Sequence, residues 1–142
     1  MNPNVLPTVI ATLIATVIAT LTALFVNRRR IKENLDSRLE TILKIAVEYP
    51  YLEHLPFTSQ WQKRKKTDER YQRYDLYCNL IFNYLESLSD YLDYDAQKIE
   101  KEINIRDWLR LHKECWKNPS TPHENRDSYP AQFVTLVNNY LD

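Results

Sequence analysis

The sequence contains no glycine. Tight hairpin turns and phosphate-binding loops depend on glycine, because it adopts positive φ angles and lets backbones approach closely. Its absence argues against β-hairpins, P-loops and dinucleotide-binding folds. We therefore expect an all-α protein whose helices are joined by proline-marked loops.

Potential metal ligands are also scarce. The three histidines, His54, His112 and His123, show no ligand spacing to each other or to the cysteines. We therefore expect no metal centre and no cofactor. The two cysteines, Cys78 and Cys115, are expected in cytosolic helices, where a small buried apolar role is favoured over a disulfide.

Ionisable side chains are missing from residues 1–26. The uncharged run from Val5 to Val26 corresponds to about 33 Å of helix, enough to cross the hydrocarbon core of a bilayer. The sequence therefore predicts a short external tail at residues 1–4 and a transmembrane helix at residues 5–26.

A basic cluster follows this run directly: Arg28, Arg29, Arg30 and Lys32. The positive-inside rule places such a cluster at the cytoplasmic headgroups, with the N-terminus outside and the rest of the chain in the cytoplasm. A cleaved signal peptide would carry its positive charges before the apolar run. We expect a single-pass protein of the cell membrane.

The apolar run repeats a four-residue unit, Ile-Ala-Thr followed by Leu or Val, at residues 10–13, 14–17 and 18–21. On a helix this pattern gathers small residues on one half of the surface and large apolar residues on the other. Small residues let helices approach closely in lipid. The small half is the predicted homo-oligomer interface or, if the oligomer encloses water, the pore lining: Ala11, Ala15, Ala19, Ala23, Thr8, Thr12, Thr16 and Thr20. Accidental repetition is the alternative, since threonine also bonds its own helix.

After the span, apolar residues continue at steps of three and four up to Pro50, which predicts a juxtamembrane stalk helix over residues 27–49. Residues 50–142 are expected to form a small cytosolic helical bundle. Its first part, Tyr49 to Gln62, is expected to be a loop anchored by Phe57 and Trp61.

The pattern of caps and apolar positions divides the bundle into helices. One helix is predicted from Asp68 to about Tyr94. A second begins near Asp95, and Asn104 caps a fresh helix with its own apolar face. A short terminal helix follows Ser128.

A second basic run, Lys63 to Lys66, precedes the helix at Asp68. It predicts contact with anionic lipid or RNA phosphate. The alternative is a solvated loop compensated by Asp68 and Glu69.

Arg106, Asp107 and His112 fit a motif of seven residues: an arginine, a polar residue, four further residues and a histidine. This spacing resembles the signature of HEPN-type helical ribonucleases, which implies that the three residues are catalytic and cut RNA. Histidine transfers protons near neutral pH, and arginine holds phosphate. The alternative is that His112 lies on a buried stripe and that Arg106 and Arg110 pair with acids.

Together, the span, the helical bundle and this motif resemble the small HEPN-like single-pass membrane accessory proteins of RNA-targeting type VI-B CRISPR systems. The resemblance implies an oligomeric membrane pore or permeability effector in antiviral defence. Two alternatives stay open: a membrane-tethered HEPN-type ribonuclease, and a non-enzymatic anchor that recruits a cytoplasmic protein partner.

Overall fold

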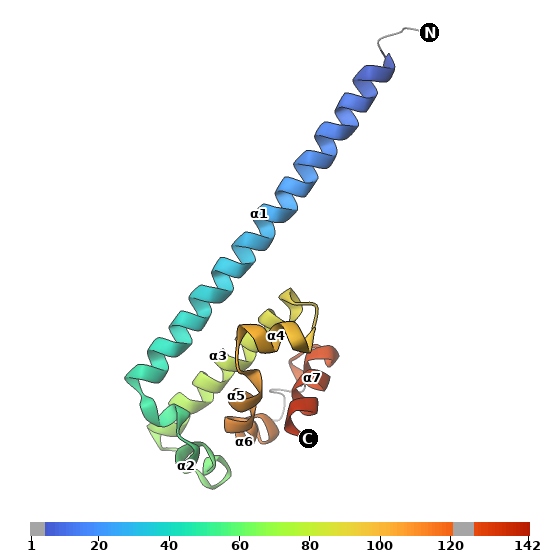
Figure 1. The fold of residues 1–142 in the computed structure, drawn as a ribbon. Coiled ribbons are helices and arrows are strands. Elements are labelled where there is room, and N and C mark those ends of the chain that lie inside the picture. The colour runs from blue at the N-terminus through green and yellow to red at the C-terminus, as the bar shows by residue number, and fades with distance from the viewer. Residues whose placement is uncertain (1–4, 121–126) are drawn as a thin grey trace. The chain divides into compact units, whose positions relative to one another are not determined.

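The computed structural model describes residues 5–120 and 127–142, with side chains from residue 9 onward. The described residues form helices joined by short turns and contain no strand, which confirms the predicted all-α class (Figure 1). The predicted external tail lies outside the described residues. Residues up to Asp36 form one compact unit, and residues from Ser37 onward form a second.

The helix α1, Val5–Glu48, is unbroken and ends just before Tyr49 and Pro50. An 18-residue window within it has a mean hydropathy of 2.5, and none of that window is buried. Among the described residues, α1 is the one helix long and apolar enough to cross a membrane. Its polar part is reinforced by exposed ion pairs four residues apart, each worth a few tenths of a kcal/mol: Arg29 with Glu33, Lys32 with Asp36, and Glu40 with Lys44.

The C-terminal end of α1 belongs to the second compact unit. Ile42 is buried there, and the Arg38 guanidinium donates a hydrogen bond to the Ser87 hydroxyl at 2.9 Å. Part of the apolar stripe predicted for the stalk therefore contributes to the core of the second unit.

The segment after α1, predicted as a loop, instead forms three short helical turns: η1 (Pro50–Glu53), α2 (Leu55–Thr58) and η2 (Trp61–Lys63). Pro50 and Pro56 lie in the first turns of η1 and α2. In a first turn the backbone N–H that proline lacks would have no acceptor within the helix, and the fixed φ angle of proline favours the turn. The prediction was wrong because these prolines start turns rather than prevent them. The predicted anchors hold: Trp61 is fully buried, and Phe57 stacks on Tyr71 at 4.4 Å between ring centres.

The helix α3, Glu69–Tyr91, forms the long central element of the second unit (Figure 1). The helix was predicted to begin at Asp68, and Asp68 is its cap, since its carboxylate accepts from the Arg70 backbone N–H at 3.0 Å. The helix closes without glycine: Asp93 and Tyr94 take positive φ angles of 57° and 56°. The Tyr94 N–H then donates to the Ser89 carbonyl at 2.7 Å, as in helix ends closed by a left-handed residue.

The next helices, α4 (Ala96–Glu102), α5 (Ile105–Leu111) and α6 (Lys113–Lys117), follow in short succession. Asp95 caps α4 and Asn104 caps α5, as predicted. The sequence did not predict the break between α5 and α6. His112 lies at that break, and the four residues of the predicted apolar stripe are all buried: Ile105, Leu109, His112 and Trp116.

The terminal helix α7, Ala131–Leu141, completes the core. Phe133 and Val137 are fully buried on its inner face. Trp116 lies between Phe82 of α3 and Phe133 of α7, with ring centres 5.1 and 5.9 Å away. Aromatic rings packed edge to face in this way hold the central helix and the terminal helix against α6.

Candidate functional site: a buried network around Glu53 and His112

The predicted motif begins in the first turn of α5. The Asn104 side chain accepts from the Asp107 backbone N–H at 3.3 Å and donates to the Asp107 carboxylate at 2.7 Å. Asp107 therefore helps to form the helix cap. Its carboxylate is engaged in local structure.

Arg106 points away from the core and is about half exposed. Its guanidinium forms an ion pair with Glu100 at 3.2 Å and lies 5.4 Å from the ring centre of Tyr140. Both contacts hold α5 to its neighbours. The arrangement matches the predicted alternative in which Arg106 pairs with an acid.

His112 is fully buried, and both of its ring nitrogens are engaged. Nδ1 lies 2.9 Å from the Tyr74 hydroxyl and Nε2 lies 3.3 Å from Oε1 of Glu53. Because a carboxylate only accepts, Nε2 donates to Glu53, and the Tyr74 hydroxyl is the hydrogen-bond partner of Nδ1. Both ring nitrogens therefore have a partner inside the core.

Glu53 is the centre of the network. Its Oε1 accepts hydrogen bonds from the Tyr77 hydroxyl and from the Trp108 indole N–H, at 3.1 Å for Trp108, in addition to the contact with His112. Burial acts to raise the pKa of Glu53, but the hydrogen bonds and the attraction of His112 outweigh it and lower the pKa below the usual 4.5. The carboxylate is therefore held ionised inside a mostly apolar domain.

The neighbouring donors are held in their neutral forms. Burial strongly raises the pKa of Tyr74 and of Tyr77, and hydrogen bonding to Glu53 adds to the effect at Tyr77. Burial likewise raises the pKa of the Cys78 thiol, whose sulfur lies 3.9 Å from Nδ1 of His112. A thiol in this state is a poor nucleophile. As predicted, Cys78 and Cys115 are buried, and neither forms a disulfide.

The predicted catalytic residues are therefore placed in two environments. Arg106 lies at the surface beside Glu100, and His112 lies in the core beside Glu53 and Tyr74. In the part of the chain that the structure describes, the two residues share no partner. Acid–base catalysis on RNA requires the histidine to reach the substrate, and here its ring is enclosed.

Sequence reasoning missed Glu53. It lies between two prolines in a segment predicted as a loop, and its partner His112 is 59 residues away in the chain. No local pattern links the two positions. The one available signal was the predicted burial of His112, since a buried imidazole requires hydrogen-bond partners.

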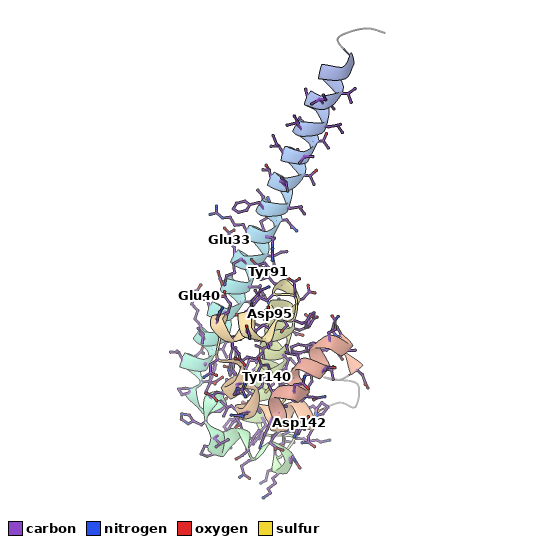
Figure 2. All side chains as sticks on the ribbon, turned by 45° about the vertical axis from the view of Figure 1, so that its right-hand side comes forward. Glu33, Glu40, Tyr91, Asp95, Tyr140 and Asp142 are labelled. Atoms are coloured by element: carbon purple, nitrogen blue, oxygen red, sulfur yellow. The ribbon has the colours of Figure 1, made fainter. Side chains whose placement is uncertain are left out.

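The residues predicted to face other copies lie on a fully exposed part of α1, and Figure 2 shows its side chains projecting all around the helix. The Thr16 and Thr20 hydroxyls donate to the Thr12 and Thr16 carbonyls, both at 2.9 Å. These threonines therefore bring no unsatisfied donor to an apolar environment. Thr8 lies within the helix, but its side chain is outside the described residues.

The second basic run is partly used inside the domain. The Arg64 guanidinium lies 3.4 Å from the ring centre of Trp61 and donates to the Trp61 carbonyl at 2.7 Å and to the Ser120 hydroxyl at 3.1 Å. The lysines Lys63, Lys65 and Lys66 are exposed. Arg64 is therefore structural. For the exposed lysines, contact with lipid or RNA phosphate stays a prediction beside the alternative of a solvated loop.

Comparison with protein-family models, with curated proteins and with solved structures finds no match to this chain. The structural class of the protein therefore follows from its own sequence and structure. In its described residues the protein is all-helical, with one long apolar helix near the N-terminus.

Proposed function

We propose that the chain is a single-pass membrane protein that self-associates through its span and presents the helical domain to the cytoplasm. The observation that carries the proposal is the apolar part of α1, whose side chains are exposed all around the helix and whose large apolar residues lie uncovered on one half of it. Leu13, Leu21 and Phe25 are 61, 60 and 70% exposed. Such a surface is stable in lipid or against other copies, but not in water.

Orientation is supported by the basic cluster. Arg28, Arg29, Arg30 and Lys32 all lie within about two turns of the end of the apolar run. Cytoplasmic loops carry such an excess of basic residues close to the membrane. The proposed topology therefore has the N-terminus outside and the second compact unit in the cytoplasm.

Self-association is supported by the difference between the two halves of the span. Ala11, Ala15 and Ala19 leave a shallow surface that another helix can approach closely. The Thr16 and Thr20 hydroxyls keep acceptor positions after donating to their own helix. An oligomer that packs the alanines together while these hydroxyls face water would form the pore implied by the resemblance to CRISPR accessory proteins, and its role in antiviral defence rests on that resemblance.

The ribonuclease alternative gains no support from the geometry, because His112 is enclosed and Arg106 is committed to Glu100. The anchor alternative differs from the oligomeric effector in the contacts made by the membrane helix, because an anchor does not require contacts between the spans of different copies. Oligomeric contact along α1 is therefore the measurement that separates the two.

Cysteine crosslinking in native membranes tests the proposal. Ala15→Cys and Ala19→Cys should form disulfide-linked dimers under mild oxidation, because their face meets another copy. Ile10→Cys and Val17→Cys, which lie on the opposite face of the helix, should not, because lipid covers them. The unmodified protein is the control for Cys78 and Cys115, which are buried.

The membranes are first washed with alkaline carbonate, which releases peripheral proteins. Release of this chain by the wash would overturn the membrane span. Equal crosslinking from both faces, or none from either, would leave the span as a plain anchor. On liposomes, dye leakage that Thr16→Leu blocks without dissociating the oligomer would establish the pore.

A further inference from the structure

A pocket of about 390 Å³ lies entirely within the second compact unit. Its apolar walls come from the C-terminal part of α1 and from the region of α5, through Leu39, Leu43, Ile103 and Leu111. The volume falls in the range of small-molecule sites, which are mostly apolar with a few placed polar groups. The Glu53 network reaches the surface here, because Glu53 and Trp108 both line the pocket.

The charge of the pocket has one sign. Glu53 and Asp107 are its ionisable lining residues, and both are acidic. The pocket therefore offers negative charge beside an apolar wall. Charge complementarity favours a positively charged ligand and disfavours an anion such as a phosphate.

The Glu53 carboxylate is preorganised to bind such a ligand, because one of its two oxygens is already fixed by hydrogen bonds. Its three donors, Tyr77, Trp108 and His112, all reach the same oxygen, Oε1. Among the described residues, no hydrogen bond reaches Oε2, and the side chain is 30% exposed. One oxygen is fixed by the core, and the other remains to accept from a ligand. A preorganised carboxylate binds a cation with little loss of side-chain freedom.

We propose that this pocket binds a small organic cation with an apolar body, whose ammonium or guanidinium group is held by Glu53 and Asp107. Leu39, Leu43 and Leu111 cover the body of the ligand. A bare metal ion does not fit this arrangement, because it would leave the apolar walls unused. The leucines thus contact the apolar body of the ligand, and the two carboxylates pair with its positive charge.

Three probes with one apolar body test the proposal on the full chain in lipid nanodiscs: phenylbutylamine, phenylbutanol and phenylbutyrate. They are cationic, neutral and anionic at neutral pH. Fluorotryptophan labelling makes the three tryptophans visible by fluorine NMR, and Trp108→Phe assigns the signal of the pocket. The amine should shift the Trp108 signal in a saturable manner. The alcohol should bind about tenfold more weakly, because it lacks the charge-assisted hydrogen bond.

Two arginine substitutions on α1 give a matched pair. Leu43 lines the pocket and is 51% exposed, and Val47, one turn further along, is 80% exposed and does not line it. Leu43→Arg should abolish amine binding by placing a tethered cation in the pocket, and Val47→Arg should leave it unchanged. Glu53→Gln should weaken the amine about tenfold while leaving the alcohol unaffected.

Equal binding of the amine and the alcohol would overturn the proposal, because the pocket would then recognise only the apolar body. Absence of a saturable Trp108 shift with the amine would overturn it as well. Leu43→Arg keeps the result interpretable if Glu53→Gln fails to fold, since Leu43 is at the surface and outside the buried network.

Discussion

The apolar part of α1 and the helix α3 are both rich in large apolar residues, yet these residues are exposed on α1 and mostly buried on α3. Every described side chain of α1 from Val9 to Arg30 is exposed. On α3, Ile81, Phe82 and Leu85 are fully buried. α3 alternates its apolar face with polar positions, whereas the span has no polar face apart from its threonines. The comparison shows that apolar content alone does not identify a core helix; under the proposed topology, lipid or other copies cover the apolar part of α1.

The largest test of this comparison truncates one leucine in each helix. Leu85→Ala should lower the free energy of unfolding of the helical domain by about 2–5 kcal/mol, because it leaves a cavity among close-packed neighbours. Leu21→Ala on the span should leave that value unchanged, because Leu21 is 60% exposed and touches no core. Denaturant unfolding in detergent, followed by near-ultraviolet circular dichroism, measures both. A comparable loss from Leu21→Ala would show that the span contributes to the domain core.

A second test separates the two residues of the motif. His112→Ala should lower the free energy of unfolding by about 1–3 kcal/mol, because it removes partners from the buried Glu53 and Tyr74. Arg106→Ala should change it by less than about 1 kcal/mol, because its ion pair with Glu100 is exposed to solvent.

RNA cleavage is measured on the same proteins. We expect none from the unmodified chain or from either variant. Cleavage that disappears in both variants while their stability stays unchanged would establish the ribonuclease alternative instead.

Local and distant interactions explain which features the sequence could predict. Asp95 and Asn104 were predicted as helix caps because a cap depends on backbone groups two or three residues away. The apolar stripe through Ile105, Leu109 and Trp116 follows from helical periodicity. Glu53 was missed because its role depends on α3 and α5, which a short segment does not reveal. The short turns at Pro50 and Pro56 were missed because proline both ends and begins helices.

The smallest effect is the pH dependence that Glu53 confers on the helical domain. Its pKa is lowered in the folded state, so the unfolded chain takes up a proton first as the pH falls. The stability from this group is therefore complete above the usual pKa of 4.5 and is lost as the pH falls through the folded value. Glu53→Gln should flatten that part of the stability curve. Asp68 and Asp95, whose pKa values are also lowered, contribute equally to both proteins and cancel in the difference.

Tyr77→Phe sharpens the test, because it removes one donor to Glu53 and nearly preserves the shape of the side chain. Without that hydrogen bond the pKa of Glu53 should move back toward its usual value, so the acid loss of stability should be smaller and should be complete at a higher pH. Tyr77 itself does not titrate in this range, since burial raises its pKa. Thermal unfolding between about pH 3 and pH 6 measures the shift. Identical curves for the unmodified protein and both variants would show that the hydrogen bonds to Glu53 do not stabilise its ionised form.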